Sequence, residues 1–321
     1  MDISVNDFEN PLFWGVPIFL LCIAIEAYIS HRENKELYEW KDTLASAWVA
    51  LGASLLNVST RVATVAFFAI FFELFKPLRE NYLGYTQLGW AWWVWLLCVL
   101  GDDFNFYWHH RFCHTVRILW AAHIVHHSSE KFNFGTALRN GWTITFFKPV
   151  YWIWLPILGF HPVMVGICLA INSTYQMFLH SRMVPSLGWF EKFFNTPWLH
   201  QVHHACNVDY LDRNHGGILI IWDKLFGTFH DNNQEPKFGV LHPPNSYNPL
   251  VLVGHEYRDI WVDVRSAKSW KDKLKYIFYP PGWSPDGSRQ TAKQMQQEQE
   301  RRLHGQTRVS FPEREPALSN S

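Results

Sequence analysis

The sequence predicts an all-α fold, in which several helices span a membrane and a helical cap on the cytosolic side carries histidine motifs. Three observations support this prediction. Four apolar regions precede a polar C-terminal third of the 321-residue chain. Its 18 Trp, 25 Phe and 12 Tyr suit a bilayer interface, where aromatic rings accumulate. Most of its 17 histidines fall between residues 109 and 230, many of them three or four residues apart.

Each apolar region predicts one helix or a pair of helices. Residues 11–30 have the length that a bilayer-spanning helix needs, about 20 residues. Residues 43–75 are too long for one bilayer thickness, so we expect one long helix that leaves the membrane, or a break near Gly52–Arg61. Residues 87–101 run without a helix breaker into DDFNFYWHHRFCH, which predicts a helix that continues out of the bilayer.

Residues 142–180 are also too long for one span, and the turn signal GFHP lies in their middle at 159–162. A helical hairpin that enters the membrane and returns on the same side fits this pattern. A buried hairpin in a soluble helical protein is the alternative. The chain thus divides into N-terminal spans (1–101), a histidine-motif region that includes the hairpin (102–245), a cytosolic segment (246–285), and a polar end with a short helix and a disordered tail (286–321).

The distribution of basic residues predicts which side of the membrane each region faces. Lys and Arg are absent before the first apolar region but frequent in the 31–42 loop, around the histidine motifs and in the C-terminal third. The positive-inside rule then predicts an integral, multi-pass membrane protein with its N-terminus outside and its histidines on the cytoplasmic face. The 28 basic residues balance the 28 acidic ones, so no net charge points to nucleic acid.

Three histidine motifs indicate a metal site. HRFCH, HIVHH and HQVHH supply eight histidines: His110, His114, His123, His126, His127, His200, His203 and His204. Side chains three and four apart share one helix face, about 5–6 Å from each other, and neutral imidazole binds Zn, Cu, Fe or Ni. A pair such as HRFCH alone is more often a surface or core coincidence than a metal site, but eight such histidines exceed the four ligands of a structural zinc ion and predict two metal ions. HExxH is absent, because Arg111 follows His110, which argues against a zinc hydrolase.

The order of these motifs resembles the fatty acid hydroxylase and sterol desaturase superfamily. The likeness covers roughly residues 95–245 and rests on DDFNFYWHHRFCH, LWAAHIVHHSSEKFNFGTALR, NTPWLHQVHH and DRNHGGILIIWDKLFGTF. Within the superfamily, HHSSE, TALR and the Gly-Gly block are similar to alkylglycerol monooxygenases and their bacterial relatives. The resemblance implies two iron ions held almost wholly by histidine, O2 as oxidant, and a membrane lipid that is hydroxylated or desaturated.

By position, the resemblance adds His180 to the eight histidines above as a ligand. Some members carry a further histidine four residues earlier, where this chain has Gln176. The residue before the Gly-Gly pair is usually tyrosine but is His215 here, and no role follows for it from the sequence.

Neighbouring polar residues are candidates to orient the ligands, since a metal-bound imidazole usually donates its other N–H to a carboxylate, carbonyl or water. Asp103 lies two helical turns before His110 on the same face and is the first candidate. Asn133, Asp212 and Asp223 follow, although each is more often a helix cap or a surface group. Arg139 is expected either to bind a lipid headgroup phosphate or to extend toward the membrane surface.

Two hypotheses about function follow. An oxygenase needs electrons from outside, because the chain has no dinucleotide-binding GxGxxG, no ferredoxin cysteine spacing and no haem CxxCH. The donor is expected to be a pterin or a redox protein. The alternative is a membrane protein that binds or transports metal through its histidines without oxidising anything; such a protein would place its ligands within the spans near mid-membrane.

Overall fold

The computed structural model describes residues 11–307, and this part of the chain is all-helical, as predicted. It contains no β-strand, only two isolated bridges, which join Phe194 to Leu219 and Ala205 to Phe238. Residues 1–10 and the tail after residue 307 lie outside the described part.

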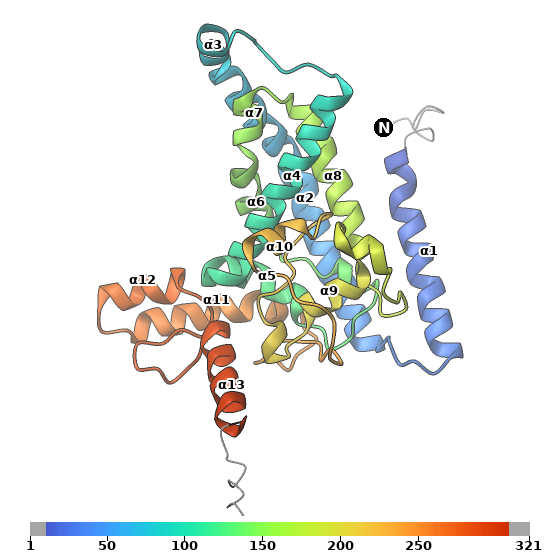
Figure 1. Cartoon of the computed structure of the whole chain (residues 1–321), viewed down its shortest axis with the longest axis vertical. Helices are drawn as coiled ribbons and strands as arrows, with labels where there is room; N and C mark the ends of the chain where they lie inside the picture. Colours follow the sequence, from blue (N-terminus) through green and yellow to red (C-terminus); the bar gives the residue numbers. More distant parts are fainter. Residues whose placement is uncertain (1–10, 308–321) are drawn as a thin grey trace, which may run out of the picture.

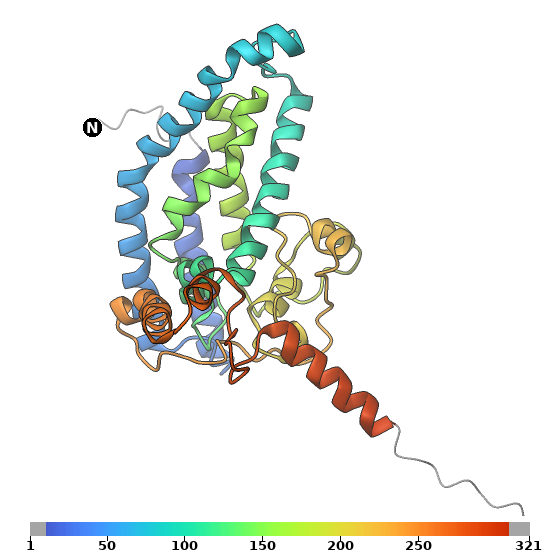
Figure 2. The same cartoon turned by 90° about the vertical axis from the view of Figure 1, so that its left-hand side faces the viewer.

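Helices along the longest axis of the molecule form a bundle (Figures 1 and 2). They are α2 (Trp40–Leu74), α4 (Trp92–Thr115), α6 (Ile144–Trp152), α7 (Trp154–Leu158) and α8 (Pro162–Met177), and α1 (Pro11–Arg32) runs beside them. The expected helix from the apolar run at 87–101 into the first histidine motif is α4, which is continuous through His114. The expected hairpin turns at Gly159, whose φ of 99° suits the absence of a side chain, and α8 starts at Pro162 with the His161 side chain as its N-cap.

Helix α2 is continuous, so the chain does not break near Gly52–Arg61. Gly52 serves a close approach instead of a break. A Cβ there would lie 2.4 Å from the indole of Trp142, whose Nε1 donates to the carbonyl of Val49. The missing side chain therefore lets the Trp142 ring seat against the helix.

The stretch Trp40–Leu83, which includes the short α3 (Lys76–Leu78) and the π-helical turn η2 (Arg79–Leu83), is the one helical stretch in the described residues that is long and apolar enough to cross a membrane. Ile144–Leu158 is apolar but shorter. The prediction of several spans is therefore met only in part.

At the far end of the bundle the buried Arg79 guanidinium donates to the carbonyl oxygens of Phe72, Thr86 and Ile157, which closes the turn onto α7.

The remaining elements form a cap at the other end of the bundle. They are α5 (Arg117–His127), η3 (Thr136–Leu138), η4 (Gly188–Lys192), α9 (Pro197–His204), η5 (Val208–Tyr210), α10 (Ile221–Phe226), α11 (Pro249–Ser266), α12 (Trp270–Phe278) and α13 (Ala292–Thr307). The polar C-terminal segment does contain a helix, α13, which points away from the bundle (Figure 2). The tail predicted to be disordered lies outside the described residues.

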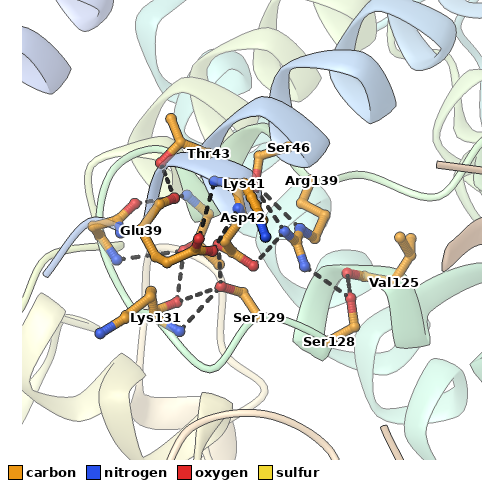
Figure 3. Close-up of polar contacts among 12 residues, drawn as sticks. Glu39, Lys41, Asp42, Thr43, Ser46, Val125, Ser128, Ser129, Lys131 and Arg139 are labelled. Atoms are coloured by element: carbon orange, nitrogen blue, oxygen red, sulfur yellow. Dashed lines mark hydrogen bonds and ion pairs between the residues drawn. The ribbon is translucent and has the colours of Figure 1, made fainter. Parts of the chain in front are cut away.

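A buried ion pair joins the start of α2 to the cap (Figure 3). The Arg139 guanidinium, 1% exposed, lies 2.7 Å from Asp42 Oδ1 and also donates to the hydroxyl oxygens of Ser46 and Ser128. Ser129 donates to the other Asp42 oxygen at 2.7 Å. The expectation that Arg139 reaches a lipid headgroup is wrong, because its charge is satisfied inside the protein.

We expect Asp42→Ala to lower the free energy of unfolding by about 3–5 kcal/mol, because the Arg139 charge is then buried without a partner. Urea unfolding in detergent, followed by circular dichroism, measures the change. The double variant with Arg139→Met removes both charges and should be more stable than Asp42→Ala alone. Glu33→Ala, which breaks the exposed pair with Lys35, is the control, with a loss of about 0–1 kcal/mol. An Asp42→Ala protein as stable as the control would contradict this account of the ion pair.

Candidate metal centre

Helix ends bring the nine histidines singled out in the sequence to one place in the cap. They come from the end of α4 (His110, His114), from α5 (His123, His126, His127), from the residues just after α8 (His180) and from α9 (His200, His203, His204). His123 is partly exposed and the other eight are buried. Burial of so many polar rings implies a partner that stabilises them.

The nine side chains form two clusters, and within each the candidate ligand atoms lie within 4.8 Å of one another. The first cluster holds His110, His114, His123, His127 and His203. The second cluster holds His126, His180, His200 and His204. Helical spacing separates the histidines within each motif, because residues i and i+4 share a helix face more closely than i and i+3. The i, i+4 pair of HIVHH lies in the first cluster and its middle histidine in the second. The i, i+4 pair of HQVHH lies in the second cluster and its middle histidine in the first.

Backbone carbonyls orient the rings. Nδ1 of His110 lies 2.9 Å from the His215 carbonyl oxygen, and Nδ1 of His203 lies 2.9 Å from that of Arg213. In the second cluster, Nδ1 of His126 faces the Arg139 carbonyl at 3.2 Å, and Nδ1 of His180 faces the Gln176 carbonyl at 2.9 Å. A carbonyl only accepts, so each of these Nδ1 atoms carries the proton and each Nε2 presents a lone pair.

These lone pairs point at one another. Nε2 of His180 lies 3.1 Å from Nε2 of His126 and 3.1 Å from Nε2 of His204. In the first cluster, Nε2 of His123 lies 3.1 Å from Nε2 of both His110 and His127. With bonds of about 2.1 Å to a shared ion, ligand nitrogens lie roughly 3.0–3.4 Å apart. The spacing thus fits imidazoles arranged around a cation, which would remove the repulsion between facing lone pairs.

Protonation offers no other way to stabilise the clusters. Burial lowers the pKa of all nine imidazoles below the usual value, and neighbouring histidines lower it further in most of them. The rings are therefore neutral at physiological pH, which is the form that binds metal. Nε2 of His114 and of His203 are buried without a hydrogen-bond partner, so they too are available to an ion.

Of the three candidate carboxylates, one contacts a ligand ring and two contact the backbone of the loop that follows residue 214. Asp212 touches a candidate ligand, with Oδ1 3.5 Å from Nδ1 of His114. Asp223 accepts from the backbone N–H groups of His215 and Gly216 at 2.7 Å. Asp103 accepts from the backbone of Ile218 at 2.6 Å and Leu219 at 3.0 Å, and from the Trp222 indole. Asp103 therefore holds the 218–222 segment, while Asn133 accepts from the backbone of Thr136 at the start of η3 and donates to the Leu37 carbonyl.

Two further positions depart from the family pattern. The Gln176 amide donates to Asn172, which in turn donates to Asp102. Gln176 therefore belongs to a chain of polar contacts that joins α8 to α4. His215 is fully buried, and neither of its ring nitrogens has a hydrogen-bond partner, although Nδ1 lies 3.8 Å from Asp223 Oδ1. Its ring centroid lies 5.1–5.8 Å from those of His114, His203 and His110. Sequence reasoning gave His215 no role, because it lies in a loop where spacing carries no information about proximity.

The adjacent pair His109–His110 separates in space. His109 packs against Tyr151 and Trp152, away from both clusters, and burial lowers its pKa to about 3. Only His110 faces the candidate metal centre, as the spacing of HRFCH predicts.

A cavity of about 890 Å³ reaches the first cluster, which contributes His114, His127 and His203 to its lining. This volume lies within the usual range for small-molecule sites, about 300–1,000 Å³. Trp120 forms one wall beside His114, and α11 lines it with His255 and Glu256, among others. His255 is buried, and its Nε2 has no partner. The cavity therefore offers both an aromatic wall and polar groups beside the clusters.

The chain was compared with known proteins. Residues 95–228 match the family model described as fatty acid hydroxylase. The chain is similar to the alkylglycerol monooxygenase of Homo sapiens, with 36% identity over 276 residues, which are 84% of this chain and 59% of that protein. The Xenopus tropicalis alkylglycerol monooxygenase is 32% identical over 283 residues, 88% of this chain and 61% of that one.

The ornithine lipid hydroxylase OlsE of Rhizobium tropici is 27% identical over 233 residues, 68% of each chain. No solved structure matches the chain. The chain spans about three fifths of the length of the two alkylglycerol monooxygenases. With the histidine motifs inside the matched region and gathered into two clusters, the chain belongs to the fatty acid hydroxylase family.

Proposed function

We propose that this chain is an integral membrane, non-haem di-iron oxygenase that hydroxylates a lipid with O2 and external electrons. One observation carries the proposal: two adjacent buried clusters of neutral imidazoles, with ring nitrogens spaced as around shared ions, in a chain of the fatty acid hydroxylase family. Desaturation is the related outcome that the same site would support.

The nine clustered histidines are the proposed iron ligands. Bound iron would supply the activation of O2 that cutting an unactivated C–H bond requires. The protein's part is to fix the rings and keep water away. The carbonyls of His215, Arg213, Arg139 and Gln176 hold four ring orientations, and Phe132 packs over His180 and His204 with centroids 5.5 and 5.1 Å away.

Asp103 is proposed as a positioning residue. It touches none of the nine rings through its hydrogen bonds, but it fixes Ile218 and Leu219 while Asp223 fixes His215 and Gly216. Together these carboxylates set the segment whose His215 carbonyl orients His110. Its role is therefore indirect.

The proposed substrate is a lipid oxidised close to its polar headgroup, either an ether lipid or an acylated amino lipid. The clusters lie where the apolar helices end, so carbons near the headgroup reach them with the least distortion of the lipid. The names of the relatives, alkylglycerol monooxygenase and ornithine lipid hydroxylase, are in keeping with this class. The cavity beside His114 is the proposed route for a polar group, and the external electron donor is a pterin or a redox protein.

The alternative, a metal-binding or transport protein without oxygenase activity, is less consistent with the geometry. A transport site would lie midway along the bundle. The clusters instead lie in the cap, where α4 and α8 end and α5 and α9 are short.

We expect purified protein loaded anaerobically with ferrous iron to hold about two iron ions per chain, because each cluster converges on one position. Elemental analysis measures this ratio. His126→Ala should lower the content mainly at the second cluster and His203→Ala at the first, while His304→Ala, on the exposed face of α13, should leave it unchanged. One tightly held zinc ion and no iron would contradict the proposal.

In proteoliposomes with a chemical reductant, O2 uptake should depend on an ether lipid or an acylated amino lipid, and mass spectrometry should detect the oxidised product. Oxidation beside an ether oxygen consumes O2, two electrons and two protons, releases water and gives a hemiacetal that collapses to an aldehyde and an alcohol. Oxidation on an acyl chain gives a stable alcohol. His126→Ala and His203→Ala should lose activity, since each removes a ligand. Full turnover in either variant would refute the histidine assignment.

Both histidine-rich segments are expected to face the cytoplasm, because Lys and Arg concentrate around them. Reporter fusions placed after Arg139 and after Arg213 test this topology, and a fusion after Thr86, on the far side of α2, is the control with the opposite expected signal. A non-cytoplasmic signal at Arg139 or Arg213 would show that the orientation is wrong.

A further inference from the structure

Helices α11 and α12 each expose large apolar side chains within the described residues. On α12 the residues Trp270, Leu274 and Phe278 follow one another at intervals of four, so they form a single stripe, and they are 67%, 46% and 57% exposed. On α11, Trp261 and Val262 are 61% and 57% exposed. An apolar stripe of this size on a polar helix marks a surface that meets another apolar phase.

Helices α11 and α12 pack together as a second hairpin, and the opposite side of this α11–α12 hairpin is held against α5 and the segment before α13. Tyr276 is buried, with the guanidinium carbons of Arg117 and Arg289 at 5.9 and 5.4 Å from its ring. Both guanidinium groups also bind Asp263 of α11, at 2.6 and 2.9 Å. The stripe therefore faces outward because the hairpin is held from behind, and it is not exposed by loose packing.

The hairpin meets the bundle where the apolar surface of α2 begins. Leu252 and Val253 of α11 pack against Ala45 and Val49 of α2 in one buried cluster. From this level onward α2 exposes apolar side chains, among them Leu44, Trp48, Leu51, Leu55, Val58 and Val62. The hairpin lies across the end of the bundle, at a steep angle to its long helices (Figures 1 and 2). A helix that lies in the plane of a membrane surface has this orientation relative to spanning helices.

The charges around the stripe are basic. Between residues 265 and 275 the chain has five basic residues and one acidic residue: Arg265, Lys268, Lys271, Lys273 and Lys275 against Asp272. The Arg265 guanidinium lies 5.8 Å from the Trp261 ring centroid, and the Lys271 ammonium lies 6.0 Å from that of Trp270. Basic groups beside interfacial aromatic rings can contact anionic headgroups while the rings enter the apolar layer.

We propose that α11 and α12 form an interfacial anchor, which lies on the headgroup layer of the membrane that α2 crosses and binds anionic lipid there. Trp270, Leu274 and Phe278 enter the boundary between headgroups and acyl chains, and the five basic residues bind phosphate groups. The inference rests on the proposed membrane insertion. Because Arg117 and Asp263 link the anchor to the cavity lining, the anchor also holds that wall of the cavity at the level of the lipid headgroups.

Site-specific photo-crosslinking in the full-length protein tests the anchor. A benzophenone amino acid is placed at Leu274, at Leu303 as a comparably exposed leucine on α13, the helix that points away from the bundle, and at Val62 on α2 as the membrane reference. Each variant is reconstituted in phosphatidylcholine vesicles with and without phosphatidylglycerol, and lipid adducts are quantified by mass spectrometry.

We expect lipid adducts at Val62 and Leu274 but not at Leu303, with a severalfold increase at Leu274 when phosphatidylglycerol is present. Charge reversal in the Lys268→Glu, Lys271→Glu, Lys273→Glu triple variant should abolish this increase and leave the Val62 adducts unchanged. These lysines are exposed, so the variant should fold, which an unchanged metal content verifies.

Adducts at Val62 with none at Leu274 would overturn the anchor while leaving membrane insertion intact. Protein adducts in place of lipid adducts at Leu274 would show that the face docks on a polypeptide, which also overturns the anchor. Absence of lipid adducts at Val62 as well would refute membrane insertion, and the anchor with it. Equal labelling of Leu274 in both vesicle types would reject the role of the basic residues.

Discussion

The structure depends on the burial of neutral imidazoles whose ring nitrogens face one another. His126 and His180 each donate a hydrogen bond from Nδ1–H to a backbone carbonyl, so the lone pairs on their Nε2 atoms face each other at 3.1 Å in the buried interior of the cap. Such an arrangement is unfavourable for the protein alone and becomes favourable around a cation. The carbonyls, the loop carboxylates and the packing of the cap all serve to hold the rings in this arrangement.

The second constraint is that each cluster combines histidines from the segment before the α6–α8 hairpin, residues 110–127, with histidines from the segment at its end and after it, residues 180–204. The same residue, Arg139, links them to the bundle: its carbonyl orients His126 while its guanidinium binds Asp42 at the start of α2. Movement of α2 relative to the cap would therefore shift Arg139 and with it the ring of His126 in the second cluster. A site that holds metal beside a membrane gains from this link, because the ligand geometry does not depend on loops alone.

Much of this architecture could be predicted because it has a local signal. The apolar runs and the turn signal at residues 159–162 predict the long helices, and the spacings of three and four predict which histidines share a helix face. The same spacing separates the histidines within HIVHH and within HQVHH, but which histidines of different motifs meet in one cluster has no local signal, because it depends on the packing of distant segments. The same is true of Arg139 and His215, whose surroundings come from distant segments. The sequence left open whether the helix breaks near Gly52, since a missing side chain marks either a break or a close contact, and only the position of Trp142 decides between them.

The central claim is that two metal ions are held almost wholly by imidazole. X-ray absorption at the iron edge of the anaerobically loaded protein tests it most directly, because outer-shell scattering distinguishes imidazole from carboxylate and thiolate ligands. The account predicts a nitrogen-dominated first shell with strong imidazole scattering, which weakens in both His126→Ala and His203→Ala. A first shell dominated by sulfur or by carboxylate oxygen, unaffected by either substitution, would contradict it.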